Sequence, residues 1–298
     1  MTSAEKFTGI VTPVLTPFNA DGSIAEDLYV EHCAQMLAEG ADYLSPFGTS
    51  GEALSVSIPE RRDLLEKLIA RGVARPDQLM PGTGLCSLGD TLALTAHAVE
   101  LGCAAVMTLP PFFYPDPGDA GLYRYFATLI EAVGSEALRV CLYHIPQNAG
   151  VGISPTLAAR LSEDFPGIVC AYKDSSGNWE NTEAVIRSAP GISVFPASES
   201  LIPAAMALGA GGCISATCNV NVAQIARVYA ACLAGDAQAV EAERPSMDRL
   251  RSAVQQAGLI PALKSMKAHA TGDARWLNTR APLLNADPET GARLAALL

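Results

Sequence analysis

The chain has 298 residues, 49% of them hydrophobic, which suits one large core or two small domains but not a string of domains. Its 20 basic and 31 acidic residues give a net charge of −11, and so acidic a surface argues against binding to nucleic acid or to a membrane surface. Charged residues make up only 17%, which excludes an intrinsically disordered chain. Only five of the basic residues are lysines: Lys6, Lys67, Lys173, Lys264 and Lys267.

Three features of the sequence bear on the cellular compartment and on metal binding: the N-terminus, the cysteines and the histidines. Residues 1–13 lack a basic start followed by an apolar run, so no secretion signal is predicted, and no run of about 18 apolar residues predicts a transmembrane helix. Eight scattered cysteines without a C-x-x-C pair indicate buried thiols in a reducing cytoplasm. The four histidines lack ligand spacing, so no metal site is predicted.

Short apolar runs alternate along the chain with longer segments of helical spacing. Each run ends at a cluster of Gly, Pro, Ser or Thr, and segments such as 27–40 and 58–72 end in glycine, the usual helix stop signal. The predicted strands are residues 9–14, 43–48, 79–84, 104–110, 139–145, 168–174, 192–198 and 211–217.

This alternation predicts an α/β fold. The apolar runs lack the in/out alternation of half-exposed strands and are therefore typical of parallel strands buried on both faces. Eight such runs over about 220 residues fit a (β/α)₈ TIM barrel. A doubly wound sheet usually has fewer strands and an early G-x-G-x-x-G turn, which the GTG at 82–84 does not form. We expect a barrel over residues 1–234 that carries the active site, with a C-terminal helical extension over residues 235–298 packed on it.

Active sites of such barrels lie at the C-terminal ends of the strands, and Lys173 closes one of them. The run before it is apolar apart from a tyrosine hydroxyl, so the lysine is partly desolvated, which favours its neutral amine. A neutral amine forms a Schiff base with a ketone, and the protonated imine then acts as an electron sink. The alternative is a strand-end lysine that pairs with Asp174 or points into solvent.

Tyr143 lies near the end of the preceding predicted strand, at a similar height to Lys173. Adjacent parallel strands are about 4.8 Å apart, so the two side chains can converge in the barrel mouth. A phenol beside an imine is suited to carry protons. The alternative is a tyrosine that only packs in the barrel.

Two glycine-containing segments follow as candidate binding elements. In residues 48–52, Gly48 and Gly51 flank the hydroxyls of Thr49 and Ser50, a combination of donors that suits a carboxylate. Thr49 is also a candidate proton relay between Tyr143 and the substrate, and the alternative is an ordinary helix N-cap. The glycines of residues 211–217 let backbone approach a ligand closely or serve tight barrel packing.

Together these residues resemble the dihydrodipicolinate synthase / N-acetylneuraminate lyase family of class I, Schiff-base aldolases. The resemblance runs from residues 9–18 through 260–264, and its specific motifs are GTSGE at 48–52, YHIP at 143–146 and YKDSSG at 172–177. It implies a (β/α)₈ barrel with a C-terminal helical extension, a homotetramer built as a dimer of dimers, and no need for a metal or an organic cofactor.

The resemblance also implies roles for individual residues. Lys173 matches the Schiff-base lysine and Tyr143 the proton donor and acceptor. Thr49 and Ser50 match a hydroxyl pair, one member of which binds the pyruvate carboxylate. Ile214 matches a position whose backbone carbonyl faces the bound pyruvate.

Two departures from the synthases bear on the substrate. Synthases carry a tyrosine pair after the fourth strand, and the second tyrosine completes a proton relay across the dimer interface; here the matching residues are Phe112 and Phe113, and Tyr114 follows one residue late. Synthases also carry an arginine after the YxxP motif that grips the carboxylate of aspartate semialdehyde, whereas here no cation follows. Gln147 and Asn148 stand there instead, and these amides suit the hydroxyls of a sugar acid or satisfy loop backbone.

The sequence therefore predicts a cytoplasmic, pyruvate-dependent aldolase or lyase that cleaves or forms a 2-oxo-3-deoxy sugar acid. Its partners are small molecules, pyruvate or another 2-oxo acid together with an aldehyde. The alternatives are 4-hydroxy-tetrahydrodipicolinate (dihydrodipicolinate) synthase, a Schiff-base dehydratase of a related sugar acid, a non-catalytic 2-oxo acid sensor, and a metal-dependent aldolase.

Overall fold

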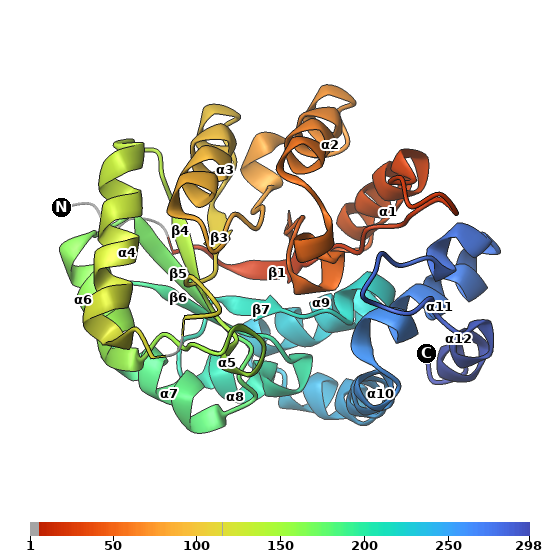
Figure 1. Ribbon diagram of the computed structural model, residues 1–298. Helices are drawn as coiled ribbons and strands as arrows, with labels where there is room; N and C mark the ends of the chain where they lie inside the picture. Colours follow the sequence, from red (N-terminus) through yellow and green to blue (C-terminus); the bar gives the residue numbers. More distant parts are fainter. Residues whose placement is uncertain (1–5, 115) are drawn as a thin grey trace. The chain divides into compact units, whose positions relative to one another are not determined.

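The computed structural model describes residues 6–114 and 116–298, which form two compact units. Among the described residues, 6–9 and 76–214 belong to the first unit, and 10–75 and 215–298 to the second. Figure 1 follows the chain by colour. The N-terminal stretch read for a targeting signal lies partly outside the described residues, as does the proline after Tyr114.

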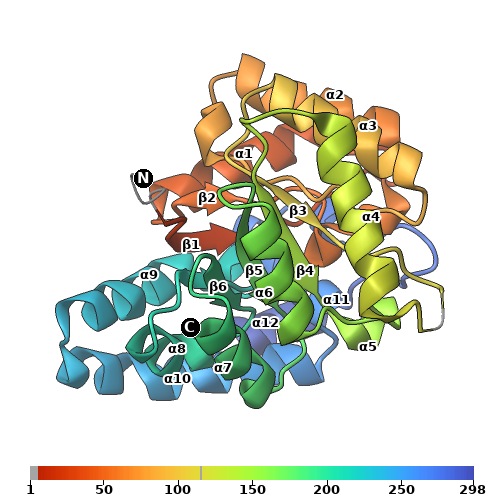
Figure 2. The same ribbon diagram turned by 90° about the vertical axis from the view of Figure 1, so that its left-hand side faces the viewer.

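Four parallel strands in sequence order form the sheet of the first unit (Figure 2). They are β3 (Val106–Thr108), β4 (Val140–His144), β5 (Val169–Asp174) and β6 (Ser193–Pro196). Every residue of β3, β4 and β6 is buried, which is why their sequences show no in/out alternation. A further strand, β7 (Gly212–Ile214), follows β6 in the chain and contacts it.

The third predicted strand, residues 79–84, is reduced to a single parallel bridge between Gly82 and Met107. Met107 N–H donates to the Pro81 carbonyl at 2.9 Å, and Thr83 N–H donates to the Met107 carbonyl at 3.0 Å. Pro81 has no N–H of its own to extend the ladder. The segment therefore runs beside β3 without forming a strand.

The helices of the first unit pack against one another in chain order, α3 on α4, α4 on α6 and α6 on α7 (Figure 2). Three of these helices start at polar caps, because Ser87, Ser154 and Asn178 each accept a hydrogen bond from a first-turn N–H. The bounds are α3 (Leu88–Glu100), α4 (Gly118–Val133), α5 (Pro146–Ala149), α6 (Pro155–Asp164), α7 (Trp179–Ser188) and α8 (Ile202–Ala207), with 3₁₀ turns η3 (Pro76–Gln78) and η4 (Glu199–Leu201).

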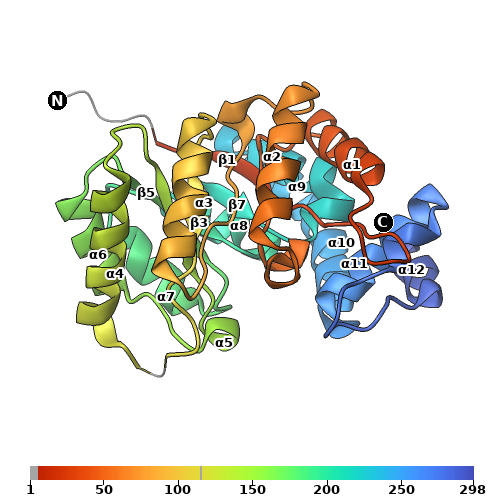
Figure 3. The ribbon, with the colours of Figure 1, turned by 45° about the horizontal axis from the view of Figure 1, so that its top comes forward.

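The second unit combines N-terminal elements with all the C-terminal helices, and Figure 3 shows α11 and α12 side by side. Strand β2 (Tyr43–Leu44) pairs in parallel with Val11 and Thr12 of β1 (Gly9–Thr12). The other bounds are α1 (Glu26–Ala38), η1 (Thr49–Gly51), η2 (Ala53–Ser55), α2 (Ile58–Ala70), α9 (Cys218–Ala234), α10 (Ala237–Gln256), α11 (Leu259–Thr271), η5 (Ala274–Leu277) and α12 (Pro288–Ala295).

The predicted C-terminal extension is helical and packs around buried Leu263, Met266 and Trp276. Gly235 ends α9 with φ 69°, so the predicted boundary falls at a junction between two helices. The division into domains 1–234 and 235–298 stays a prediction.

The two glycines that precede and open β7 serve close backbone packing. A Cβ on Gly212, whose φ is +153°, would lie 1.9 Å from the Gly9 carbonyl oxygen. A Cβ on Gly211 would lie 2.8 Å from the Ser193 Cβ. The packing alternative therefore accounts for both glycines.

The cysteines are free thiols, and four of them are buried: Cys33, Cys141, Cys213 and Cys218. The prediction of burial is wrong for Cys86, which is exposed in the loop before α3, and is met only in part by Cys103, Cys170 and Cys232, which are half-buried. Within the described residues, no group of His, Cys, Asp or Glu side chains is placed to hold a metal ion. None of the described helices combines the length and the apolar character that crossing a membrane requires.

The pair formed by Glu60 and Arg280 is expected to give the second unit a pH-dependent stabilisation. Arg280 donates to Glu60 Oε1 at 2.5 Å, and this hydrogen bond is the main reason that the pKa of Glu60 falls to about 2. Because the folded pKa lies below the ordinary value of 4.5, the pair stabilises the fold above that pH and loses this effect as the pH falls towards 2. Glu60→Gln is therefore expected to lower the unfolding midpoint in urea at pH 7 while the difference from wild type shrinks towards pH 2. An equal decrease in the unfolding midpoint at pH 7 and at pH 2 would contradict this expectation.

Candidate active site

Lys173 and Tyr143 are direct neighbours across β5 and β4. The register of the two parallel strands pairs Tyr143 with Lys173, so both side chains leave the sheet on the same face. The Lys173 Nζ lies 4.2 Å from the centroid of the Tyr143 ring, within the range of a cation–π contact. The structure thus brings together the two side chains that the sequence singled out for chemistry.

Neither alternative environment for Lys173 is found. The side chain does not point into solvent, because Lys173 is only 4% exposed and Tyr143 only 3%. Lys173 does not pair with Asp174 either, because successive residues of a strand face opposite sides. Within residues 6–114 and 116–298, Lys173 forms no ion pair with any carboxylate.

Asp174 is instead held by the segment that follows β5. Its Oδ1 accepts from Ser176 N–H at 2.9 Å and from Ser176 Oγ at 2.6 Å. Its Oδ2 accepts from Asn181 Nδ2 and from Thr182 Oγ1, both at 2.8 Å. This carboxylate ties the end of β5 to α7 on the face opposite Lys173.

A second set of contacts fixes the end of β4 on the same face as Asp174. Tyr172 donates to the Ile153 carbonyl at 2.8 Å and stacks on His144, with ring centroids 5.7 Å apart. The Ile153 N–H donates to His144 Nδ1 at 2.9 Å, and burial lowers the pKa of His144. The imidazole is therefore neutral with its proton on Nε2. The sequence analysis did not predict that Tyr172 and Asp174 support the strand ends, although both alternate with Lys173 in the strand and therefore lie on the opposite face.

Two further predicted residues lie in the same unit as Lys173. Ile214 is the fully buried last residue of β7. Asn148 lies in the short helix α5, directly after β4, and is exposed. The neighbouring Gln147 donates to the Ser175 carbonyl at 2.6 Å and so satisfies loop backbone. The Asn148 side chain has no hydrogen bond to any of the described residues.

The segment that replaces the tyrosine pair of synthases follows β3 and is exposed. Phe113 is 93% exposed and Tyr114 63%. Phe113 has a φ of 76°, which is uncommon for an aromatic residue. Phe112 is half-buried, and its carbonyl accepts from Cys86 Sγ at 3.1 Å.

The predicted carboxylate-binding residues lie in the second unit, where Thr49 and Ser50 open the turn η1 directly after Gly48. Gly48 is the N-cap of this turn and makes no side-chain cap. The helix that follows, α2, is capped by Ser57 in a capping box with Glu60. The alternative that Thr49 or Ser50 caps this helix is therefore wrong.

Packing against the N-terminal segment holds the turn η1. The Gly51 carbonyl accepts from Thr16 Oγ1 at 2.8 Å. A Cβ on Gly51 would lie 2.7 Å from the Val14 carbonyl oxygen, so only glycine fits there. Ser50 is buried and Thr49 is half-buried.

Comparison with known proteins assigns the whole chain to a family. The sequence model of the dihydrodipicolinate synthetase family matches residues 6–298. An uncharacterized DapA-like lyase of Chloroflexus aurantiacus is 35% identical over 97% of this chain and 95% of its own. A 4-hydroxy-tetrahydrodipicolinate synthase of Thermus thermophilus is 36% identical over 78% of this chain and 76% of its own. The crystal structure of dihydrodipicolinate synthase from Agrobacterium tumefaciens matches with a TM-score of 0.89 and 30% identity over 98% of each chain.

The chain belongs to the dihydrodipicolinate synthetase family. Its fold is the (β/α)₈ barrel of that family with C-terminal helices, as predicted. It is a carbon–carbon lyase of the class I type, so the predicted family and enzyme class are confirmed.

Proposed function

We propose that this chain is a pyruvate-dependent aldolase that cleaves or forms a 2-oxo-3-deoxy sugar acid through a Schiff base on Lys173. The observation that carries the proposal is the position of the Lys173 amine. It is buried at the end of β5, lies 4.2 Å above the Tyr143 ring and has no carboxylate partner among the described residues. A buried amine that lies beside a phenol and outside any ion pair is suited to attack a bound ketone.

In the cleavage direction, the Lys173 amine attacks the C2 carbonyl and water leaves, giving a protonated imine. Tyr143 takes the proton of the C4 hydroxyl. The C3–C4 bond breaks, its electron pair enters the imine, and the aldehyde departs from an enamine. Protonation of the enamine at C3 and addition of water to the imine release pyruvate and restore the free amine.

The remaining predicted residues are proposed to bind substrate. The hydroxyls of Thr49 and Ser50, with the backbone at Gly48, take the carboxylate of the 2-oxo acid, and Thr49 also relays protons. The Ile214 carbonyl faces the pyruvate half, and Asn148 hydrogen-bonds a hydroxyl of the aldehyde half. No metal ion or organic cofactor takes part in this scheme.

The sugar-acid assignment rests on two segments: the residues that follow β3 and the helix α5 directly after β4. Phe112 and Phe113 have no hydroxyl with which to carry a proton. Both amides of α5 are exposed. Gln147 is engaged with the Ser175 carbonyl, whereas the Asn148 side chain has no hydrogen bond to the described residues. A neutral amide suits a hydroxyl and is a poor substitute for a bidentate carboxylate clamp.

A second candidate is 4-hydroxy-tetrahydrodipicolinate synthase, because that is the name carried by the Thermus relative. Turnover of pyruvate with aspartate semialdehyde at a useful kcat/KM would favour it over the sugar-acid reaction. A dehydratase of a related sugar acid uses the same imine and would show loss of water without release of pyruvate.

Borohydride trapping and a substrate panel test the proposal together. Reduction in the presence of pyruvate is expected to leave a pyruvate-derived adduct on the peptide that carries Lys173. A panel of 2-oxo-3-deoxy acids is then assayed for pyruvate release, with Lys173→Ala as the blank. An unlabelled Lys173 would reject the mechanism, and a labelled lysine with no pyruvate release from the panel would reject the sugar-acid substrate.

Tyr143→Phe is expected to lower kcat by roughly 10²–10⁴-fold, the usual contribution of general acid–base catalysis. The ring that covers the Lys173 amine is retained, so borohydride should still trap pyruvate on the variant. Single-turnover rates of pyruvate release measure the effect. A kcat within threefold of wild type would remove Tyr143 from proton transfer.

We also propose a cytoplasmic homotetramer built from dimers, as the family resemblance implies. The exposed ring of Phe113 supports a contact with a second copy. Sedimentation equilibrium of the wild-type chain tests the oligomeric state, and a monomer at micromolar concentration would reject it.

A further inference from the structure

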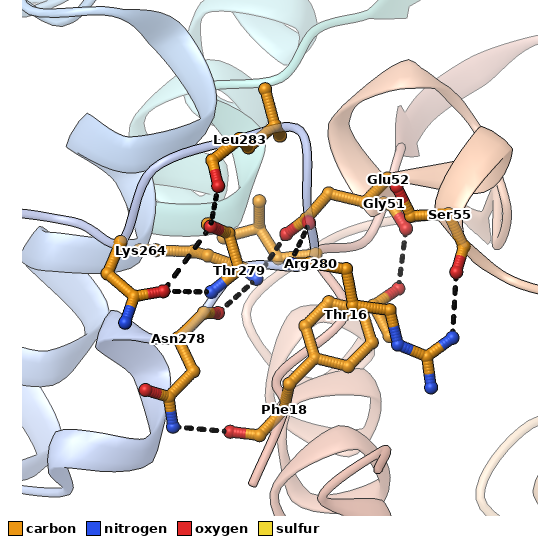
Figure 4. A network of polar contacts seen from close by, with 12 residues as sticks. Thr16, Phe18, Gly51, Glu52, Ser55, Lys264, Asn278, Thr279, Arg280 and Leu283 are labelled. Carbon is orange, nitrogen blue, oxygen red and sulfur yellow. Dashed lines mark hydrogen bonds and ion pairs between the residues drawn. The ribbon is translucent and has the colours of Figure 1, made fainter. Parts of the chain in front are cut away.

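A buried polar network connects the C-terminal segment to the turn that carries Thr49 and Ser50 (Figure 4). We infer that Lys264, Glu52 and Arg280, here called the Glu52 clamp, are positioning residues that hold this turn in its carboxylate-binding conformation. The inference rests on the function proposed above. It adds the C-terminal segment to the machinery of that reaction.

Glu52 is the centre of the clamp. It lies between η1 and η2, two residues after Ser50, with φ 55° and ψ 39°. Residues other than glycine adopt this left-handed conformation only when their surroundings hold them there. Glu52 is buried, so its carboxylate is the group through which the surroundings act.

Lys264 of α11 provides the charge that compensates the Glu52 carboxylate. The two side chains form an ion pair in which both are 0% exposed. Lys264 Nζ also donates to the Asn278 carbonyl at 2.7 Å and lies 4.5 Å from the centroid of the Phe18 ring. Burial lowers the pKa of Lys264 to about 8, and Glu52 opposes that shift.

Arg280 takes the other oxygen of Glu52 and also holds the far end of η2. Its backbone N–H donates to Glu52 Oε2 at 3.0 Å. Its guanidinium donates to the Ser55 carbonyl at 2.7 Å and to the Gly22 carbonyl at 2.8 Å. Both oxygens of Glu52 and the carbonyl that ends η2 are therefore held by residues more than 200 positions away.

The hydrogen bonds inside the turn are all local. Gly51 N–H donates to the Gly48 carbonyl and Glu52 N–H to the Thr49 carbonyl, both at 3.1 Å. Such bonds define a 3₁₀ turn, but they do not tie it to the rest of the unit. Thr16, on one side, and the Glu52 clamp, on the other, are two of the connections that do so.

A buried ion pair is a weak source of stability, because apolar residues of the same volume often serve as well. The pair of Lys264 and Glu52 has a different role, because it fixes the left-handed backbone of Glu52 beside the hydroxyls of Thr49 and Ser50. It sets the direction in which Thr49 and Ser50 present their donors. Loss of the clamp is therefore expected to weaken carboxylate binding more than it slows the chemistry on Lys173.

Lys267 offers a matched control for the test. It lies on the same helix, three residues after Lys264, and is also buried. Its amine donates to Gln35 Oε1 at 2.8 Å and has no contact with the clamp among the described residues. Lys264→Met and Lys267→Met thus remove the same group from the same helix, the first from an ion pair with a buried carboxylate and the second from a hydrogen bond to an amide.

The experiment measures the rate at which borohydride inactivates the enzyme as the pyruvate concentration is varied. For Lys264→Met, the pyruvate concentration that gives half the maximal rate is expected to rise about tenfold or more, with the maximal rate within threefold of wild type. For Lys267→Met, both values should stay within about twofold of wild type, although its Tm falls as well. Should Lys264→Met fail to fold, Glu52→Gln keeps the side-chain volume and carries the same expectation.

Equal half-saturation in wild type, Lys264→Met and Lys267→Met would overturn the inference and leave the proposed function standing. A rise of the same size in both lysine variants would overturn it too, because the effect would then follow from general destabilisation. No pyruvate adduct on Lys173 in the wild-type enzyme would overturn the proposed function, and the inference with it.

Discussion

Lys173→Ala is expected to lose pyruvate release by at least about 10³-fold, because no other group can supply the covalent imine. Lys173 is buried beside the Tyr143 ring and forms no ion pair with a carboxylate among the described residues. Its replacement by a methyl group therefore leaves no buried charge unpaired. The fold should therefore survive, and circular dichroism and Tm should stay close to those of the wild type. The loss is then attributable to chemistry.

Lys173→Arg provides the matched control for charge. It keeps a cation above the Tyr143 ring, but a guanidinium stays protonated and forms no useful imine. Both variants should be inactive and should resist borohydride in the presence of pyruvate. Measurable single-turnover activity of either variant would place the nucleophile elsewhere.

Lys264→Met is expected to lower the free energy of unfolding by about 3–5 kcal/mol, the cost of breaking a buried pair. The substitution leaves the Glu52 carboxylate buried without its main counter-ion. The double variant Glu52→Gln with Lys264→Met removes both charges, so it should recover much of that loss. Urea unfolding of the wild type, both single variants and the double variant gives the coupling energy directly.

The half-exposed pair of Lys67 and Glu26 provides the comparison for this cycle, and Lys67 also pairs with Asp63 at 2.6 Å. Its side chains are 34% and 37% exposed, and the amine and the carboxylate are 2.7 Å apart. Lys67→Met is expected to cost about 0–1 kcal/mol, as is usual for surface pairs. Equal losses for Lys264→Met and Lys67→Met would show that burial of the first pair has no energetic consequence.

The strands and the reactive pair could be predicted because they leave a periodic trace in the sequence. The apolar runs at 139–145 and 168–174 contain β4 and β5, and two strands read in parallel place Tyr143 beside Lys173. The run at 79–84 has a similar apolar character. It forms only one bridge, because Pro81 lacks the N–H that a ladder needs.

The Glu52 clamp could not be predicted in the same way. A lysine in an amphipathic helix usually lies on the exposed face, where arginine would serve as well, and nothing local sets Lys264 apart from that pattern. Its partner Glu52 is 212 residues away in the sequence, and no local pattern connects them.

The N-cap alternative for residues 49–50 and the expected burial of Cys86 are wrong for a shared reason. Both predictions were based on the local composition, whereas capping and burial depend on the residue at which the next helix begins. Ser57, rather than Thr49 or Ser50, starts α2, and Cys86 falls in the loop just before Ser87 starts α3.

In the proposed enzyme, the strands carry the residues that break the bond, and the segment after β4 carries the residue that binds the aldehyde half. Lys173 and Tyr143 stand on a hydrogen-bonded sheet that Asp174 and Tyr172 brace from its other face. Asn148 stands on the four-residue helix α5, where it is exposed and its side chain has no hydrogen bond to the described residues. A change of aldehyde partner can therefore arise by substitution in α5 at little cost to the bond-breaking chemistry. If the proposed sugar-acid reaction holds, directed evolution towards other aldehyde partners should begin with a library at residues 147–150.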